Sequence, residues 1–420
     1  MKIGFFTDGY LPQPNGVATS VYSSAKALEK RGHEVYVIAP KQPGYIDEKN
    51  VYRLTSLKFY GKADFRIALN LPEKPLREIL KLDFEIVHGH AGGPVTFLVW
   101  QVARLKNVPF VGTYHTLWNR YTHYILKGRL IRPKMAEVAS KIFGNLCDLL
   151  IAPTPKVKEE LISYGVKKPI EIVGSGLDLD RFGSGEKGFL RKRLGLKDGE
   201  PILLYVGRVG REKSVDFLLK AFSQIHNSHP RSHLVLVGDG TDREKLEKVA
   251  KKLKIAKNTH FTGFIDQKYI QKVYPDADIF VFSSQTETQG LVIIEAFASG
   301  LPVVAVKDAA FEGVVINDKN GFLVKKDPKA FANKVSFLLD NDKKREELAK
   351  NARETAQDFS VEITAEKLEI IYKKIIASYR NKKRLREKIK DLRSFMNLTT
   401  RVNKLKNILI YPYFGVGNER

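Results

Sequence analysis

Residues 2–40 are KIGFFTDGYLPQPNGVATSVYSSAKALEKRGHEVYVIAP, and they divide into four segments. KIGFFTD is a short apolar run typical of a buried strand, and YLPQPNGV is a loop rich in Pro and Gly. ATSVYSSAKALEKRG has the apolar spacing of an amphipathic helix, which Gly32 ends. HEVYVIAP is a second apolar run. A strand, loop, helix and strand in this order predict two parallel strands joined by a right-handed crossover.

The same alternation continues along the chain in two series. The first series adds FEIVHGH, VPFVGTYHT and DLLIAPT, each an apolar run that ends in polar or glycine residues. The second series runs from Pro201 to Val324 and alternates apolar runs with helical patterns. We therefore expect an α/β protein with two Rossmann-like parallel-sheet domains that face each other across a cleft. Ligands of such sheets lie at the carboxyl ends of the strands.

A length of 420 residues, 43% of them hydrophobic, suits two domains of ordinary size. We place the first domain at residues 1–175 and the second at 176–358. The segment 359–379 is expected to be a helix that returns to the first domain. Residues 380–420 form a basic amphipathic helical tail in this interpretation.

The net charge of +24 is concentrated toward the end of the chain. Residues 380–420 contain 12 Lys and Arg against 3 Asp and Glu, and apolar residues recur among them at helical spacing. This composition favours a polyanionic partner, either nucleic acid or an anionic membrane surface. The alternative is that the tail packs on the first domain.

The single cysteine, Cys147, excludes an internal disulfide and a zinc cluster built from cysteines. No apolar run approaches the 18 residues needed to span a bilayer, and Thr7, Asp8 and Gly9 interrupt the first run too early for a signal peptide. We therefore expect a cytoplasmic protein. Asp8, at the end of the first strand, is interpreted as a cap of the next turn.

Residues 286–305, TETQGLVIIEAFASGLPVVA, are the most specific motif in the chain. Glu287 lies in the loop before a predicted helix, and Glu295 lies within that helix. Gly290, followed by Leu291, would let a phosphate approach the exposed N–H groups at the positive end of the helix dipole. Two carboxylates could then hold hydroxyl groups on either side of that phosphate. For an isolated pair, a solvated loop glutamate and an ordinary helix glutamate would be the simpler interpretation.

The motif resembles the Glu-x7-Glu signature of glycosyltransferase family 4, whose members are retaining enzymes with the GT-B fold and a nucleotide-sugar donor. PNGVATSV resembles the glycine loop of that family, with Gly16 at the matching position. VGRVGREKSVDFLLKAF resembles the family element that contacts the diphosphate through Arg208 and Lys213. Ser214 departs from the pattern because a glycine is usual there. The resemblance covers roughly residues 1–375.

The resemblance implies a role for each matching residue. Two cations suit the reaction, because cleavage of a sugar–phosphate bond develops charge on the leaving diphosphate. No metal ion is expected, since Asp178 and Asp180 fall at the domain linker and are interpreted as a turn. Glu295 would hold the ribose, Glu287 the sugar hydroxyls, and His115 would face the sugar near the acceptor. The catalytic set is His115, Arg208, Lys213 and Glu287, and the donor-binding set is Gly16, Arg208, Lys213, Glu287, Gly290, Leu291 and Glu295.

The acceptor side is suggested by residues 115–143, in which aromatic and aliphatic side chains are interleaved with cations. An interfacial membrane helix has this composition. An ordinary helix packed on the core, with a basic outer face, has it too, and both interpretations stay open. The residues assigned to the acceptor or the membrane are Trp118, Arg120, Tyr121, Tyr124, Lys127, Arg129 and Arg132.

HTLWNRYTHYI and TETQGLV most resemble the bacterial diacylglycerol glucosyltransferases, the monoglucosyldiacylglycerol synthase group. This resemblance implies transfer of glucose from UDP-glucose to a membrane lipid such as diacylglycerol, by a peripheral enzyme on the inner face of the cell membrane. One alternative is a soluble family 4 enzyme that acts on a polysaccharide or a small molecule. A nucleic-acid-binding α/β protein is disfavoured, because no RNA-binding motif is recognisable.

Overall fold

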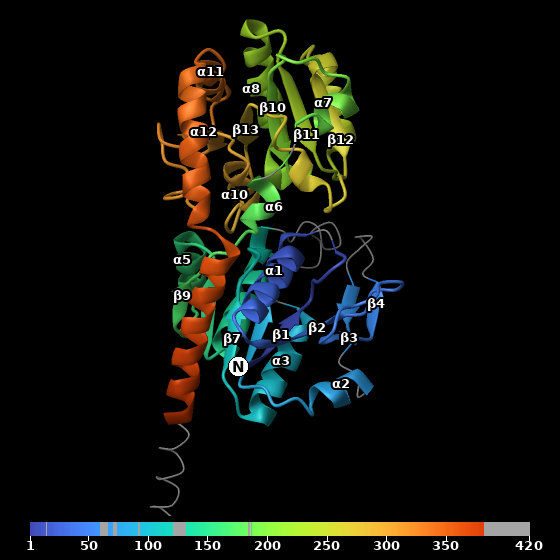
Figure 1. Cartoon of the computed structure of the whole chain (residues 1–420), viewed down its shortest axis with the longest axis vertical. Coiled ribbons are helices and arrows are strands. Elements are labelled where there is room, and N and C mark those ends of the chain that lie inside the picture. Colours follow the sequence, from blue (N-terminus) through green and yellow to red (C-terminus); the bar gives the residue numbers. More distant parts are fainter. Residues whose placement is uncertain are drawn as a thin grey trace, which may run out of the picture. The chain divides into compact units, whose positions relative to one another are not determined.

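A computed structural model of the chain describes residues 1–13, 15–58, 66–69, 74–90, 93–120, 132–183, 185 and 187–381. The first domain contains a sheet of seven parallel strands (Figure 1). Its strand order changes direction between β1 and β6, where Thr7 pairs with His90 at the carboxyl edge. In spatial order its strands are β3 (Val51–Leu54), β2 (Glu34–Pro40), β1 (Lys2–Thr7), β6 (Ile86–His90), β7 (Phe110–Thr113), β8 (Leu149–Ala152) and β9 (Ile170–Ile172).

The second domain contains a sheet of six parallel strands, and its order changes direction between β10 and β13. In spatial order its strands are β12 (Thr259–Gly263), β11 (His233–Val237), β10 (Ile202–Val206), β13 (Ile279–Phe282), β14 (Val303–Val306) and β15 (Gly321–Val324). Two short strands, β4 (Ser56–Lys58) and β5 (Arg66–Ala68), form a separate antiparallel pair. The two parallel sheets confirm the predicted Rossmann-like domains.

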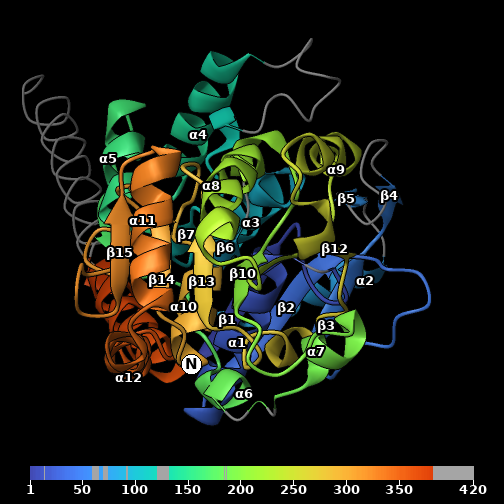
Figure 2. The same cartoon turned by 90° about the horizontal axis from the view of Figure 1, so that it is seen from above.

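Helices lie in most of the connections between parallel strands, as right-handed crossovers favour, although none joins β2 to β3 or β14 to β15, two connections that the structure describes in full. In the first domain they are α1 (Gly16–Lys30), α2 (Lys74–Ile79), α3 (Pro94–Lys106), α4 (Pro133–Leu146) and α5 (Pro155–Ser163). In the second they are α6 (Leu179–Gly183), α7 (Phe189–Leu194), α8 (Val215–Ser228), α9 (Arg243–Lys252), α10 (Leu291–Ala298), α11 (Pro328–Leu339) and α12 (Asp342–Gln357). Figure 2 shows α8 and α11 side by side, and these two helices are in contact.

Each domain has its own hydrophobic core. The strands of the first sheet bury Phe6, Phe110 and Leu150, and none of the first cluster's residues comes from beyond Ile170. The second cluster begins at Leu177 and includes large buried side chains such as Phe282. Since burial of a large apolar side chain contributes roughly 1.5–3 kcal/mol, each core supplies a large driving force for folding.

The chain passes between the two domains at two adjacent points. Leu177 N–H donates to Phe359 O, and Val361 N–H donates to Leu177 O, both over 2.9 Å. The backbone is helical again over residues 361–381. Arg31 Nε lies 2.6 Å from a carboxylate oxygen of Glu369 in this helix. The contacts divide the chain into one unit of Met1–Glu369 and another of Ile370–Arg420, and residues 382–420 of the predicted basic tail lie outside the described part.

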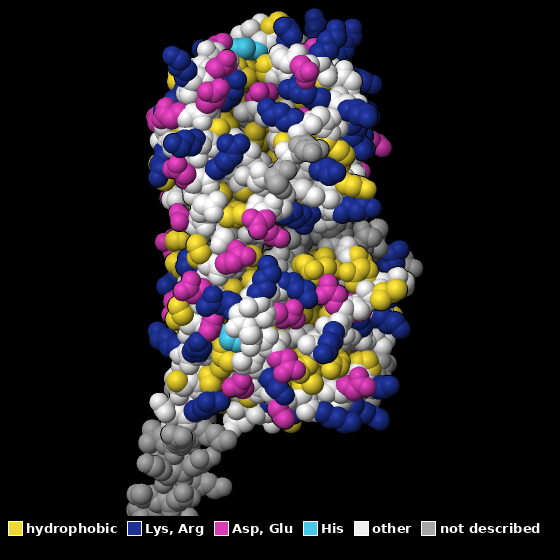
Figure 3. All heavy atoms as spheres, in the orientation of Figure 1, with side chains coloured by type: hydrophobic (Ala, Val, Ile, Leu, Met, Phe, Trp, Pro, Cys, Tyr) yellow, Lys and Arg dark blue, Asp and Glu magenta, His cyan; other side chains and the backbone are white. Residues whose placement is uncertain are grey.

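Basic side chains are distributed rather than gathered on the surface that Figure 3 presents. There, Lys and Arg are interspersed with Asp and Glu. No helix within the described residues has the length and apolar character needed to cross a bilayer.

Candidate functional site

Two loops meet where the strand order of the second sheet changes direction. One follows β10 and contains Arg208 and Lys213, and the other follows β13 and contains Glu287. Lys213 Nζ donates to Glu287 Oε1, and only 13% and 14% of these side chains are exposed. Ser283 Oγ also donates to Lys213 O over 2.7 Å, which ties the loops together. Parallel sheets bind ligands at this position because adjacent loops diverge there.

The charge of Glu287 is maintained by its neighbours. Burial by itself would raise the pKa of Glu287, but the Lys213 ammonium and a hydrogen bond with Ser284 outweigh it, so the pKa is lowered. Glu287 is therefore an ionised hydrogen-bond acceptor at neutral pH. Lys213 is its partner, and this contact joins two residues that the sequence assigned separately to the diphosphate and the sugar.

Arg208 lies on the same edge of the sheet and is fixed through its backbone. Tyr205 Oη donates to Arg208 O over 2.9 Å. The guanidinium of Arg208 is partly exposed, with Nη1 3.6 Å from Glu212 Oε1. A guanidinium that is partly exposed beside a buried carboxylate can bind a phosphate in two-point fashion.

Ser214 follows Lys213 with a left-handed backbone, φ 51° and ψ 41°. Glycine adopts this conformation without the steric cost that a side chain incurs, which explains why a glycine is usual at this position in the family that the sequence resembles. The serine hydroxyl accepts a hydrogen bond from Lys326 Nζ over 2.9 Å. The departure from the family pattern therefore leaves the backbone turn intact.

Helix α10 begins beside the Lys213–Glu287 pair. Gly290 precedes it with φ 76°, and a side chain there would meet Phe311 at 2.6 Å. A capping side chain is therefore absent, and the first-turn N–H groups of Leu291 and its neighbours lie at the positive end of the helix dipole. This end of the helix can bind an anion.

Glu295 lies one turn further along α10. Tyr274 Oη donates to Glu295 Oε2, and Tyr274 is fully buried. Burial raises the pKa of Glu295, while the Tyr274 hydrogen bond and the charge of Arg181 act against that rise. One carboxylate oxygen is thus bound by Tyr274, and the hydroxyl group that sequence analysis assigned to Glu295 would bind through the other.

The first domain approaches α10 through Gly16, the first residue of α1. A methyl group added at Gly16 would lie 3.8 Å from Leu291 Cδ1, which is ordinary van der Waals contact. Asn15 caps α1, because its Oδ1 accepts from Ala18 N–H over 2.9 Å. Two helix N-termini, those of α1 and α10, therefore lie near one another.

His115 follows β7 and is one of three neighbouring histidines. His90 Nδ1 lies 3.2 Å from His115 Nε2, and the rings of His88 and His90 are 4.0 Å apart. Burial lowers the pKa of His88 to about 3 and that of His115 to about 4, and it lowers the pKa of His90 well below its ordinary value. All three imidazoles are therefore neutral at pH 7. His115 O accepts from Thr288 Oγ1 over 3.0 Å, so the histidine contacts the loop that carries Glu287.

The prediction that Asp8 caps the turn after β1 is wrong, because its carboxylate binds the start of α3, which is distant in the sequence. Asp8 accepts hydrogen bonds from Gly93 N–H and Val95 N–H at the start of α3, over 3.0 and 3.2 Å. Burial raises the pKa of Asp8 to about 6, against the effect of these two bonds. Asp8 is thus a helix cap.

The predicted acceptor segment is only partly described. Trp118 is partly buried against the first core, Arg120 is exposed, and Arg132 precedes α4. Tyr121, Tyr124, Lys127 and Arg129 lie outside the described residues. The described residues after Arg132 form α4, which packs on the core.

Helix α4 has two apolar faces. Its inner face buries Ala136, Ser140, Phe143 and Gly144. Met135, Val138 and Ile142, at helical spacing, are 54%, 48% and 57% exposed. Helix α4 thus packs on the core and also presents an apolar stripe to the outside, and the interfacial membrane helix stays a prediction.

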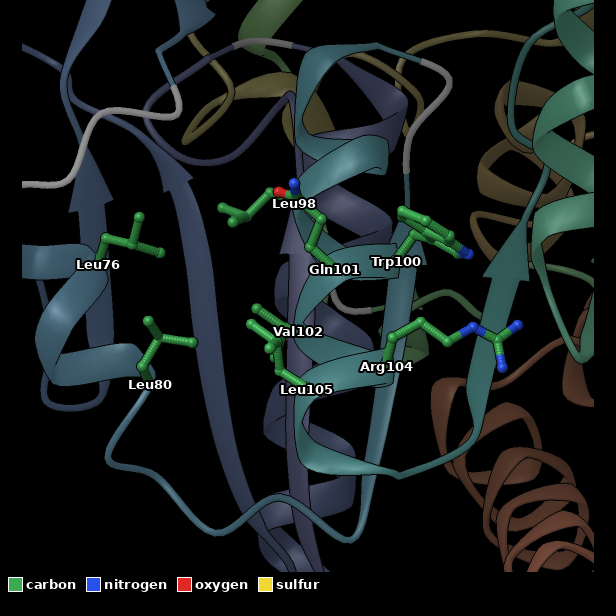
Figure 4. Close-up of a pocket in the computed structure, with 8 residues that line it drawn as sticks. All are labelled: Leu76, Leu80, Leu98, Trp100, Gln101, Val102, Arg104 and Leu105. Carbon is green, nitrogen blue, oxygen red and sulfur yellow. The ribbon is translucent and has the colours of Figure 1, made fainter.

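A pocket of about 350 Å³ lies between α2 and α3, where leucines of the two helices face each other (Figure 4). Leu76, Leu80 and Leu105 line it, with Arg104 at its edge. None of the predicted site residues lines this pocket. Within the described ranges, no group of three or more His, Cys, Asp or Glu side chains is placed to hold a metal ion.

Several residues near the site were missed by sequence analysis. Thr154 Oγ1 donates to Thr288 O over 2.8 Å, and Gln289 exchanges two hydrogen bonds with the backbone of Ser175. Lys156 also contacts the loop that carries Glu287, and Tyr274 contacts the side chain of Glu295 in α10. Gln289 lies within the motif of residues 286–305, and its place in that motif could have identified it. The others occur in segments that look like ordinary helix starts or strands.

The chain matches two family models that together cover most of its length. Residues 14–181 match the model described as Glycosyltransferase Family 4, and residues 186–355 match that described as Glycosyl transferases group 1. The α-monoglucosyldiacylglycerol synthase of Acholeplasma laidlawii is 31% identical over 404 residues, with 92% of this chain and all of that protein covered. The enzyme of the same name from Streptococcus pneumoniae is 35% identical over 73% of this chain and 71% of that protein.

Solved structures show the same fold. A crystal structure of Anabaena HepE in complex with UDP-glucose has a TM-score of 0.69 and 19% sequence identity, and the match covers 89% of this chain and all of that one. The expected GT-B arrangement of two Rossmann-like domains is therefore confirmed.

Proposed function

This chain belongs to the family 4 glycosyltransferases, and we propose that it moves a hexose, with retention of configuration, from a nucleotide sugar to a membrane lipid. Glucose, UDP-glucose and diacylglycerol are the proposed sugar, donor and acceptor. The observation that carries the proposal is the buried Lys213–Glu287 pair between the α10 N-terminus and His115. The names of the two synthases described above support the lipid acceptor.

On the donor side, the second domain supplies most of the binding groups. The partly exposed guanidinium of Arg208 and the N-terminus of α10 would contact the diphosphate. Lys213 would shift from Glu287 toward the diphosphate as negative charge develops on it, and stabilise the transition state more than the ground state. Glu287 would then accept hydrogen bonds from sugar hydroxyls. Glu295 would accept hydrogen bonds from the ribose.

On the acceptor side, the first domain would complete the site. The N-terminus of α1 at Gly16 would contribute backbone N–H groups to the phosphates. His115, neutral because burial lowers its pKa to about 4, can donate or accept a hydrogen bond without adding charge beside the sugar. Retention of configuration rests on family membership.

A membrane acceptor also requires a surface that meets the lipid. The exposed stripe Met135, Val138 and Ile142 on α4, preceded by Arg132 and Lys134, fits the composition of an interfacial helix. The proposed location is the inner face of the cell membrane, with the basic residues of 380–420 adding attraction to anionic lipid. Cations near an anionic surface contribute about 1 kcal/mol each.

The test is transfer of radiolabel from UDP-glucose to vesicles that contain diacylglycerol and an anionic lipid. We expect label in the organic phase, increasing with anionic lipid, and absent for Glu295→Ala. Glu346→Ala, on the exposed face of α12, is the matched control and should retain activity. If label reaches only a soluble acceptor, the proposed lipid acceptor is wrong and the proposed transferase activity stands. Absence of nucleotide-sugar turnover with every acceptor would refute the proposed function.

A further inference from the structure

A lysine of the first domain forms a buried ion pair with an aspartate of the second. Lys156 lies in the first turn of α5, and Asp308 follows β14. Lys156 Nζ is 2.7 and 2.8 Å from the two carboxylate oxygens of Asp308. Only 13% of the lysine side chain and 6% of the aspartate side chain are exposed. The pair therefore has little competition from water.

The same ammonium group also contacts the backbone of the loop that carries Glu287. Lys156 Nζ donates to Glu287 O over 3.2 Å and lies 3.4 Å from Gln285 O. Asp308 is independently fixed, because its Oδ1 accepts from Ala310 N–H over 2.7 Å. Lys156 thus connects the fixed Asp308 carboxylate to the backbone carbonyl groups of Gln285 and Glu287.

Other contacts of this loop with the first domain are neutral hydrogen bonds. Thr154 Oγ1 donates to Thr288 O, Thr288 Oγ1 donates to His115 O, and Gln289 bonds to the backbone of Ser175. The ammonium of Lys156 can donate three hydrogen bonds and is the charged member of this set. Its loss would leave the buried Asp308 carboxylate without this cation, an effect that a neutral contact cannot reproduce.

We propose that Lys156 is a positioning residue that holds the backbone of Glu287 in register with His115 of the first domain. The inference rests on the proposed function, in which Glu287 binds sugar hydroxyls. The donor groups Arg208 and Lys213, in contrast, both belong to the second domain. Lys156 therefore affects the geometry of transfer more than the binding of the nucleotide.

The main variant is Lys156→Met, which keeps an unbranched side chain and removes the ammonium. We expect kcat for hexose transfer to fall by about tenfold or more, since small displacements of reacting groups have effects of this size. The Kd of UDP should change by less than about twofold, because the variant leaves the groups that bind the nucleotide unchanged. Lys156→Arg should recover part of kcat, because a guanidinium can pair with Asp308. Lys307→Met, which removes an exposed cation 3.5 Å from Glu312, is the matched control and should change neither value.

Amide hydrogen exchange of residues 284–290 provides a readout that does not require turnover. We expect Lys156→Met to increase exchange in these residues and to leave β10 and β11 unchanged. Asp308→Asn removes the same pair from the other side and should give the same pattern, which guards against a folding defect of one variant. Unchanged exchange in both variants would overturn the inference, and so would an unchanged kcat in an active enzyme. If the unmodified protein turns over no nucleotide sugar, the proposed function fails, and the exchange data alone decide whether Lys156 holds the loop.

Discussion

At the scale of single residues, backbone conformation limits what can occupy the loop after β10. Ser214 has a φ of 51° and lies between Lys213 and α8. A β-branched side chain is strongly disfavoured in this region. Serine is accommodated here with its hydroxyl bonded to Lys326.

We expect Ser214→Val to lower the free energy of unfolding by about 1–2 kcal/mol, the usual cost of a left-handed conformation for such a residue. Ser214→Gly should not lower it, because glycine adopts this conformation freely. Urea denaturation of the three proteins measures both changes. Equal free energies of unfolding for the Val and Gly variants would contradict the explanation that the left-handed backbone at position 214 favours glycine.

Gly16 provides a sharper test of the donor site. The added methyl of Gly16→Ala would meet Leu291 Cδ1 at 3.8 Å, so the fold should tolerate it. We expect an unchanged free energy of unfolding and a fall of about tenfold in kcat/KM for the nucleotide sugar, because the methyl would keep a phosphate away from the α1 backbone. Denaturation and steady-state kinetics on the same preparation separate these effects. Full activity would show that no phosphate closely approaches Gly16.

At the scale of elements, core packing does not explain the apolar stripe of α4, and we expect this stripe to contact the membrane. Val138 and Ile142 are 48% and 57% exposed on one face of the helix. The double variant Val138→Asn and Ile142→Asn should reduce binding to anionic vesicles by about tenfold or more, since two inserted apolar side chains are lost and no cation is added. Co-sedimentation with vesicles measures this.

The matched control is Ile162→Asn on α5, where the isoleucine is 54% exposed. It carries the same change at a position outside the stripe and should bind vesicles as the unmodified protein does. If the double variant also binds unchanged, α4 is not the membrane surface, and residues 121–131 or 380–420 must account for any binding.

The boundaries of most elements follow the sequence closely. The apolar run KIGFFTD became β1 (Lys2–Thr7), and the predicted helix that Gly32 ends became α1 (Gly16–Lys30). The described residues of 115–143 contain a 3₁₀ turn at Trp118–Arg120 and most of α4. Alternating polar and apolar residues predict an element only where one face is buried.

At the scale of the whole molecule, buried titratable groups link stability to pH. His88 and His115 have pKa values of about 3 and 4 in the folded protein, against 6.5 in the unfolded chain, and the pKa of His90 is also well below 6.5. The unfolded chain therefore binds more protons below pH 6.5, and the free energy of unfolding falls as pH falls from 6.5 toward 4. Asp8, with its pKa raised to about 6, acts in the opposite direction between pH 6 and 4.

We expect the free energy of unfolding to fall with a slope of up to about 1.4 kcal/mol per pH unit for each histidine, with Asp8 offsetting one such contribution. Urea denaturation at intervals from pH 7 to 4.5 gives this slope. His88→Gln removes one titrating group and should reduce the slope by the contribution of about one proton, which is about 1.4 kcal/mol per pH unit. Asp8→Asn should make the decline steeper below pH 6. A slope that neither variant changes would show that other groups control the acid sensitivity.

Local sequence was enough to predict both sheets and most of their helices, while the donor-site residues stay a prediction. Hydrophobic periodicity and turn residues act over a few positions, and the family motif places Gly16, Arg208, Lys213 and Glu287 at strand or helix ends and Glu295 within a helix. The partners of these residues did not follow from the motif.

Tertiary structure alone decided which of these groups meet. Lys213 and Glu287 are 74 residues apart, Lys156 and Asp308 are 152 apart, and Thr288 and His115 are 173 apart. No local pattern specifies such pairs, because each depends on how parallel strands are ordered and on how the two domains are joined. Burial then sets the charge of each group, which is why the neutral histidines and the ionised Glu287 could be recognised only in the folded chain.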